Sequence, residues 1–408
     1  MSTATLFDRQ YEKRKRDLLN QIVERLRPEY SAEELAALRI DRVNPAILSQ
    51  RSGRGFVNRD ILETVLGNLL ECVAPGSHNA LDPRDQRHDF VAALGEMADQ
   101  VYAMVAQSHL AVGADEQIED RALAATYALL WELPRLKRRA LWNRFASLKD
   151  PAVWDAYLRQ VCGVDDEALM ALDFATQVDA AIAARDLASY RQFLAQFRCD
   201  GVFGYQMQLV MSTYPGWRVL FYHDVAHALT RTGPPEDAPA IARCPVPLLP
   251  RAISELGGRY YQADLHPETQ IGDANFLDHP HRGLTTGQTG VIGSGCHILP
   301  CTLGGLTRRL HRRHPEIGDC VFIGTDADLF GPVRIGDHSV IGPSVEIYGN
   351  VETGARGRII LGDDVSVGDG TVIENRLETD LHIPDRAQIP ARSLVVNDGL
   401  GNPRFASP

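Results

Sequence analysis

Two patterns of hydrophobic positions divide this chain of 408 residues. Over residues 1–195, apolar residues recur at three- and four-residue spacings, which place them on one face of an α-helix. Aspartates precede several of these segments, as helix caps do, and glycine or proline separates them. The spacing predicts a helical region whose helices include residues 60–73, 89–105, 120–133 and 178–197.

A second helical stretch covers residues 196–258. It contains YPGWRVLFYHDVAHAL, which begins at Tyr214, and PLLPRAISELGG, and the proline-rich segment TGPPEDAP connects the two. Within the first region, residues 135–144 (RLKRRALWNR) form a basic helical patch. We interpret this patch as a solvated helix face, with a surface for a partner as the alternative.

From residue 259 onward, a six-residue period replaces the helical spacing. The aliphatic positions share one phase at Ile317, Ile323, Leu329, Ile335, Ile341 and Ile347, and a shifted phase at Leu361, Val367 and Ile373. In a hexapeptide β-helix, one aliphatic residue in six points into a triangular core, and each coil buries that core against its neighbours. We therefore predict a parallel β-helix over residues 259–395, followed by a tail at residues 396–408.

Composition limits the kinds of partner. The formal net charge is −11, which argues against a nucleic-acid partner because phosphate binding favours a basic face. No stretch approaches the roughly 20 apolar residues of a membrane helix, so no membrane partner is expected. The seven cysteines are scattered and form no CxxC pair. Such usage is typical of reduced thiols in a cytosol, so we expect a cytoplasmic protein.

Specific motifs occur in order along the β-helix. The segment ADLHPETQIGDANFLDH begins at Ala263, CTLGG occupies residues 301–305, and RHP occupies residues 313–315. Together with the two helical segments that precede them, these motifs resemble the DIHP…DH, VTLGG and RHP motifs of the serine O-acetyltransferase family, which are hexapeptide-repeat acyltransferases. The resemblance covers residues 200–350. It implies that the β-helix is left-handed and that the chain is an O-acetyltransferase.

His279 suits the chemistry of that family. Transfer of an acetyl group from a thioester to an alcohol requires a base that removes the hydroxyl proton, and a neutral imidazole is the natural base at neutral pH. The resemblance implies that His279 is this base and that Asp264 is the carboxylate that orients it. Asp264 precedes His279 by somewhat less than one coil of three hexapeptides, a separation that can bring the two to nearby faces. A general base contributes about 10²–10⁴-fold to the rate.

The acceptor of the family is an amino acid. The resemblance implies that Asp278 binds its ammonium group and that Arg313 and His314 bind its carboxylate, for which a guanidinium fork is well suited. The family also has an aspartate in a DPA motif before the YPG helix. The nearest candidate to that helix is Asp200 in CDGVFG, which lacks the proline.

Acetyl-CoA is the co-substrate that the resemblance implies. Family members bind CoA through backbone groups of adjacent coils, and Gly304, Gly305 and Gly324 match small positions along that groove, although tight corners would explain them equally well. The histidines lack regular ligand spacing, so no metal site is predicted. His266 is interpreted as a scaffold residue.

The family is also oligomeric. The resemblance implies a homo-oligomer, a trimer or a dimer of trimers, with each site between neighbouring β-helices. The sequence ends in Ser407-Pro408 rather than in isoleucine, so no cysteine synthase complex is expected.

Three departures from the family surround the expected acceptor pocket. The family's DH(G/A)TG becomes DHPHRG at residues 278–283, its GET becomes GQT at residues 287–289, and its glycine-rich loop becomes the basic LTRRLHR at residues 306–312. We interpret the chain as an acetyl-CoA-dependent O-acetyltransferase of amino-acid (cysteine) biosynthesis, acting on the hydroxyl of L-serine or a serine-like amino acid. The alternatives are an acyltransferase with a different hydroxyl acceptor in a specialised pathway, and a catalytically silent hexapeptide scaffold.

Overall fold

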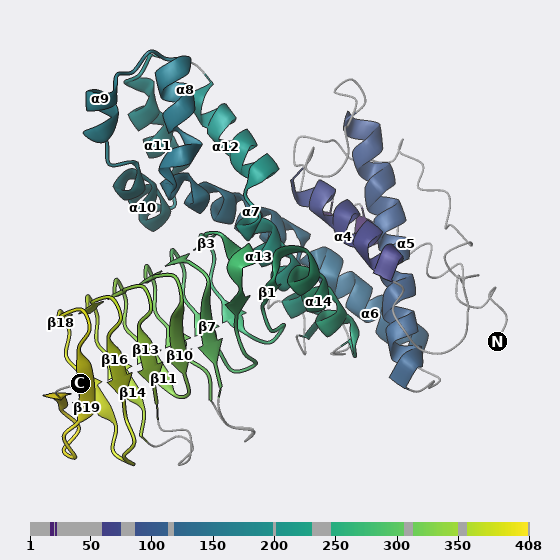
Figure 1. Ribbon diagram of the computed structural model, residues 1–408. Helices are drawn as coiled ribbons and strands as arrows, with labels where there is room; N and C mark the ends of the chain where they lie inside the picture. The colour runs from purple at the N-terminus through teal and green to yellow at the C-terminus, as the bar shows by residue number, and fades with distance from the viewer. Residues whose placement is uncertain are drawn as a thin grey trace. The chain divides into compact units, whose positions relative to one another are not determined.

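The computed structural model is shown in Figure 1. It describes residues 17–19, 21–22, 59–74, 86–112, 118–198, 201–230, 246–305, 313–349 and 357–406. Asp200 and the basic segment 306–312 lie outside the described residues.

The chain divides into two compact units. One unit comprises Met1–Ala140 and Phe221–Glu255, and the other comprises Leu141–Leu220 and Leu256–Pro408. These units are defined by contacts between residues and not by position along the sequence. They therefore do not test the domain boundaries predicted at residues 195, 258 and 395, which stay predictions.

The first unit is helical. Its helices include α4 (Arg59–Val73), α5 (Gln86–Val112) and α6 (Ile118–Trp131), and α5 packs against both of the others. These elements confirm the helices predicted over residues 60–73, 89–105 and 120–133. Three further helices contribute residues to both units: α7 (Leu133–Ala146), α13 (Gly216–Thr230) and α14 (Leu249–Tyr261).

A buried ion pair joins α7 to α13 within the first unit. The guanidinium of Arg139 donates two hydrogen bonds to the carboxylate of Asp224, at 2.9 and 2.7 Å, and the two side chains are only 10% and 5% exposed. Burial raises the pKa of Asp224, but Arg139 and His223 lower it by more, to about 2. The interpretation of residues 135–144 as a solvated face is therefore wrong at Arg139.

The second unit begins with short helical elements that follow α7. These are η2 (Ser147–Lys149), η3 (Pro151–Val153), α8 (Asp155–Gln160), α9 (Asp166–Met170), α10 (Phe174–Ala184), α11 (Leu187–Ala195) and α12 (Val202–Thr213). Aromatic side chains fill their core, where the rings of Trp154 and Phe174 stack at 4.1 Å between centroids.

The single helix predicted over residues 178–197 is two helices in the structure. Arg185 adopts a left-handed conformation with φ of 52° and ends α10. The carboxylate of Asp186 then accepts the N–H of Ala188 and caps α11. The apolar spacing continues through this break, so the spacing alone could not reveal it.

The β-helix occupies the rest of the second unit. Its strands are β1 (Ala263–Asp264), β2 (Gln270–Ile271), β3 (Phe276–Leu277), β4 (Leu284–Thr285), β5 (Val291–Ile292), β6 (His297–Ile298), β7 (Cys301–Gly304), β8 (Glu316–Ile317), β9 (Phe322–Ile323), β10 (Ala327–Phe330), β11 (Val333–Ile335), β12 (Val340–Ile341), β13 (Glu346–Tyr348), β14 (Ile359–Leu361), β15 (Ser366–Val367), β16 (Val372–Glu374), β17 (Leu381–Ile383), β18 (Gln388–Ile389), β19 (Leu394–Asn397) and β20 (Pro403–Ala406).

Every third strand belongs to the same face of the β-helix. One sheet has the order β1-β4-β7-β10-β13-β16-β19-β20, the second runs from β2 to β17, and the third runs from β3 to β18. The strands pair in parallel, except that β20 pairs antiparallel with β19. Part of the predicted tail at 396–408 therefore forms a strand on the first sheet.

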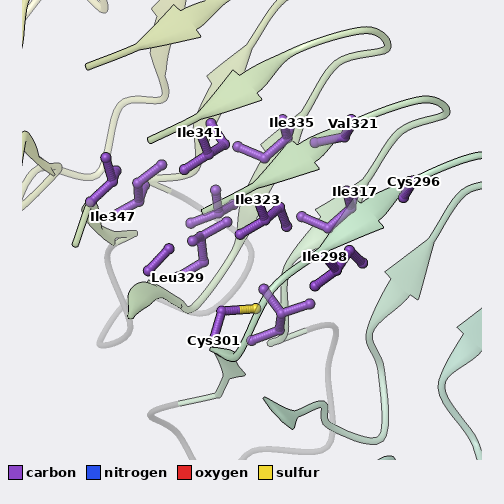
Figure 2. Packing of buried hydrophobic residues seen from close by; sticks show 14 of the residues in the cluster. Cys296, Ile298, Cys301, Ile317, Val321, Ile323, Leu329, Ile335, Ile341 and Ile347 are labelled. Carbon is purple, nitrogen blue, oxygen red and sulfur yellow. The ribbon is translucent and has the colours of Figure 1, made fainter. Parts of the chain in front are cut away.

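The predicted period defines the core. Ile317, Ile323 and Leu329 are at most 2% exposed, and Figure 2 shows them directed into the interior together with residues of neighbouring coils. Non-glycine residues such as Cys320 and His338 take φ values of 56° and 58° between strands. These features confirm the predicted parallel β-helix and are consistent with a left-handed one.

Insertions into this regular stack occur at the places where the sequence departs from the period. Ile317 pairs with Ile335, which completes one regular coil of three hexapeptides, whereas the interval between Ile271 and its partner Ile292 is longer than such a coil. The extra length corresponds to η4 (Pro280–Arg282), which follows His279. The helix η4 is therefore an excursion from the coil directly after the predicted base.

The helical part of the second unit is fixed to the β-helix by polar contacts. Lys149, whose side chain is 7% exposed, contacts Asp179 at 2.5 Å and donates to the carbonyl of Gly295 at 3.1 Å. Arg185 pairs with Asp273 at 2.6 Å. These contacts place Asp150, which directly follows Lys149, close to the first coils of the β-helix.

The sequence predicts that the chain has no membrane-spanning helix and that its cysteines are reduced. Within the described residues, no helix has both the length and the apolar character that crossing a membrane requires. Cys72, Cys296, Cys301 and Cys320 are not disulfide-bonded. Cys162, however, is disulfide-bonded, so the expectation of reduced thiols throughout is wrong at this position.

Candidate active site

The predicted base lies at a sharp turn after β3. His279 has φ of 48°, in the left-handed region, and Pro280 follows it as the first residue of η4. Its imidazole is 61% exposed, and the ring of His281 lies edge-on to it at 5.7 Å between centroids. The turn thus presents the imidazole to solvent with few packing contacts.

Asp278 lies between two histidines. Its Oδ1 is 3.4 Å from Nε2 of His279, and its Oδ2 is 3.4 Å from Nε2 of His297. The side chain is 16% exposed, and its backbone N–H donates to the carbonyl of Ile298 at 2.9 Å. The structure therefore joins Asp278 to His279 and adds His297, which the sequence analysis did not single out.

Asp264 lies in β1, on the neighbouring face. It is half-buried and opposite Thr285 in the strand pairing, and its carbonyl accepts the N–H of Thr286. The strand β1 lies against η4, with Cα atoms within 8 Å. The coil thus returns Asp264 to the neighbourhood of the turn that carries His279, although the contact of His279 described above is with Asp278.

Asp150 was missed by the sequence analysis. Its Oδ2 accepts a hydrogen bond from the hydroxyl of Tyr214 at 2.6 Å, and its Oδ1 accepts the N–H of Ala152. The pKa of Tyr214 is raised by burial, by Asp150 and by Asp278. Tyr214 therefore connects a second carboxylate, that of Asp150, to the side of the site that carries Asp278.

The sequence signal for Asp150 was present. Asp150-Pro151-Ala152 spells the DPA motif, but it lies far ahead of Tyr214 in the sequence, whereas Asp200 lies much closer to the YPG helix. The helices α8 to α12 occupy the sequence between Asp150 and Tyr214, and a hydrogen bond brings these two residues together in the fold. Asp200 itself lies outside the described residues.

Thr289 organises the predicted carboxylate-binding residues. Its hydroxyl oxygen accepts the backbone N–H groups of Arg313 and His314, at 3.0 and 3.3 Å. The guanidinium of Arg313 also donates to Oε1 of Gln288 at 3.2 Å, and Nε2 of Gln288 donates to Glu268. The GQT sequence thus links a carboxylate to Arg313 through an amide.

His314 is held as a neutral imidazole. Burial, then Arg313 and His266, lower its pKa to about 4. Its Nδ1 accepts the backbone N–H of Thr289 at 3.2 Å, so the ring carries its hydrogen on Nε2. His314 can therefore donate a hydrogen bond to a carboxylate without carrying a charge at neutral pH.

The three predicted CoA-groove glycines all lie in crowded places. A Cβ on Gly304 would lie 2.5 Å from the ring of Phe330, one on Gly305 would lie 2.7 Å from Nε2 of His314, and one on Gly324 would lie 2.5 Å from the backbone nitrogen of Pro343. Packing alone accounts for these glycines, and their role in CoA binding stays a prediction. Among the described residues, no group of three or more His, Cys, Asp or Glu side chains is arranged to hold a metal ion.

Gly287 offers a test of the position of His314. A Cβ at Gly287 would lie 1.9 Å from Nε2 of His314, so Gly287→Ala must displace the ring. If His314 binds the acceptor, the KM for the acceptor should rise at least about tenfold, because losing a hydrogen bond to a charged group costs about 1.5 kcal/mol or more. Gly258→Ala is the matched control, since nothing lies within 4 Å of its added Cβ. An unchanged acceptor KM in Gly287→Ala would contradict this placement.

Comparison with curated proteins identifies the family. No protein-family model matches the chain. Serine acetyltransferase from Synechococcus elongatus is 30% identical over 164 residues, which are 39% of this chain and 62% of that protein. Serine acetyltransferase from Staphylococcus aureus is 32% identical over 183 residues, which are 43% of this chain and 76% of that protein. The chain belongs to the serine acetyltransferase family.

The family resemblance drawn from the motifs is thus confirmed. Solved serine acetyltransferases also align with the chain. The native serine acetyltransferase 1 from Entamoeba histolytica aligns with a TM-score of 0.49 and 18% identity, over 92% of this chain and 98% of its own. Soybean serine acetyltransferase complexed with serine aligns with a TM-score of 0.34 and 17% identity, over 86% of this chain and 99% of its own.

Proposed function

We propose that this serine acetyltransferase family member transfers an acetyl group from acetyl-CoA to the hydroxyl of L-serine or a serine-like amino acid. The observation that carries the proposal is the 3.4 Å separation between Nε2 of His279 and Oδ1 of Asp278. Polar atoms on adjacent tetrahedral carbons lie about 3 Å apart in a gauche arrangement. A 1,2-amino alcohol can therefore give its ammonium to Asp278 and its hydroxyl to His279 at the same time.

His279 acts as the general base in this proposal. Its neutral imidazole takes the hydroxyl proton as the oxygen attacks the thioester carbonyl carbon, and the carbonyl electrons move onto oxygen. When the tetrahedral intermediate collapses, the carbon–sulfur bond breaks and the CoA sulfur takes the proton from the imidazolium. Asp264 orients the imidazole and stabilises its charge, as a carboxylate does in a catalytic triad.

Arg313 and His314 bind the carboxylate of the acceptor in this proposal. The guanidinium supplies a fork to two oxygens, and His314 supplies a neutral N–H. Asp150 joins Asp278 as a second partner for the ammonium group, in place of the predicted Asp200.

We also propose that a homo-oligomer, a trimer or a dimer of trimers, completes the site between neighbouring β-helices. Gly304, Gly305 and Gly324 line the groove for acetyl-CoA, and the protein acts in the cytoplasm.

A second candidate is the same acyl transfer to a more anionic acceptor. His281 and Arg282 are both exposed and directly follow the base in η4. The positive charge of Arg282 at that position favours an acceptor with a second acidic group. The compound 3-hydroxyaspartate has this chemistry, because it is a serine with an added carboxylate.

A thiol-release assay with acetyl-CoA tests the proposal. The panel comprises L-serine, its enantiomer D-serine, and three compounds that add or remove one recognised group: 3-hydroxyaspartate, ethanolamine and 3-hydroxypropionate. L-serine should support turnover, whereas ethanolamine, without a carboxylate, and 3-hydroxypropionate, without an amine, should be poor acceptors. A preference for 3-hydroxyaspartate would select the second candidate. No release with any hydroxy amino acid would reject the proposed activity.

Arg313→Lys tests the role of the guanidinium. Lysine keeps the charge but loses the two-pronged hydrogen bonding to a carboxylate. The KM for the acceptor should rise about tenfold, the loss of one hydrogen bond between charged groups, while the KM for acetyl-CoA stays unchanged. Arg392→Lys, at an exposed position in a later coil, is the control. A rise confined to acetyl-CoA would move Arg313 to the other substrate.

A further inference from the structure

His297 occupies an outward-facing column of aromatic side chains. In the third sheet Phe276 pairs with His297, and His297 pairs with Phe322. The imidazole stacks on Phe276 at 4.5 Å between centroids and meets Phe322 edge-on at 5.2 Å. Aromatic contacts on two sides hold the ring in one orientation.

That orientation aims a ring nitrogen at the acidic side of the site. Nε2 of His297 lies 3.4 Å from Oδ2 of Asp278, while the other carboxylate oxygen lies 3.4 Å from Nε2 of His279. The side chains of His297 and Asp278 are 25% and 16% exposed, so solvent only partly screens the interaction. Each oxygen of Asp278 therefore has its own neighbouring imidazole.

We propose that His297 is a positioning residue for recognition of the acceptor's amino group. It donates its N–H to Oδ2 of Asp278 and thereby fixes the carboxylate with Oδ1 beside Nε2 of His279, where the ammonium group binds. The inference rests on the proposed function. In this inference, His297 helps the enzyme to distinguish acceptors with an amino group from acceptors without one. It acts through Asp278 and makes no contact with the acceptor.

The proposed role uses His297 as a neutral donor. A neutral imidazole that donates one N–H leaves the negative charge of Asp278 available to an ammonium group. A protonated imidazole would neutralise that charge and compete with the acceptor. The other titratable groups around Asp278 are His279, the hydroxyl of Tyr214 and, through Tyr214, Asp150. The raised pKa of Tyr214 keeps its hydroxyl protonated over the neutral range.

Two substitutions separate the hydrogen bond from the packing. His297→Phe keeps a ring between Phe276 and Phe322 but removes the nitrogen. His297→Gln keeps an N–H donor but removes the ring. His382→Phe is the matched control, because it makes the same change at an exposed histidine in a later coil of the β-helix.

The full-length protein is assayed with L-serine and with 3-hydroxypropionate. In His297→Phe, the KM for serine should rise about tenfold and kcat should change less than about threefold, since one hydrogen bond to a charged group is lost. The ratio of kcat/KM for serine over 3-hydroxypropionate should fall by a similar factor. His297→Gln should restore both values, and His382→Phe should alter neither.

The split between KM and kcat, with rescue by His297→Gln, supplies the second readout, because a purely structural loss would not be restored by a variant that lacks the ring. An unchanged serine preference in His297→Phe, or a lost preference that His297→Gln does not restore, would overturn the role of His297 while leaving the proposed activity intact. Absence of turnover by the wild type would overturn the activity and this inference with it.

Discussion

His279→Ala is expected to lower kcat for acetyl transfer at least about 100-fold, the lower end of what a general base contributes. The fold should persist, because the imidazole is 61% exposed and contributes little packing. Steady-state kinetics and thermal unfolding of the same preparation measure the two effects separately. His382→Ala, which removes another exposed histidine of the β-helix, should leave both unchanged. Near-normal turnover by a folded His279→Ala protein would show that another group is the base.

The same experiment extends to the orienting carboxylate. Asp264→Asn alone should lower kcat by a smaller factor, because the imidazole can then adopt the wrong tautomer. In combination with His279→Ala it should add almost nothing, since Asp264 acts through His279 and residues that act as a unit are not additive. Full additivity of the two losses would show that Asp264 works independently of the base.

Arg139→Met is expected to destabilise the protein by about 3–5 kcal/mol, because it leaves the buried carboxylate of Asp224 without its cation. Equilibrium unfolding in urea measures this loss. Arg138→Met is the matched control, since it makes the same change at the exposed neighbouring position of α7. Equal stability of the two variants would show that the pair contributes nothing.

The pair also sets an acid limit to stability. The folded-state pKa of Asp224 lies near 2, below its ordinary 3.8. A carboxyl group with a depressed pKa stabilises the fold above its unfolded pKa and loses that contribution as the pH falls through the folded value. The contribution, about 2 kcal/mol, should therefore be full above pH 4 and fade toward pH 2. In Arg139→Met this segment of the pH profile should disappear.

The β-helix was predictable because its signal is local and repeated. One buried aliphatic residue in six, as at Ile317, Ile323 and Leu329, specifies the coil geometry within a few residues. The motif around His279 lies inside that repeat. The sequence alone therefore determined the fold class, the family and the turn that carries the candidate base.

Contacts between distant segments were decided by the tertiary structure. No period relates Asp150 to Tyr214, which lies beyond five intervening helices, α8 to α12, or Asp278 to the imidazole of His297 in the next coil. The spacing of the basic helix likewise could not show that Arg139 is buried against Asp224. A hydrophobic period reports only which face of an element is buried. The partner of a polar side chain on that element depends on how separate elements pack together, and only the folded chain specifies that packing.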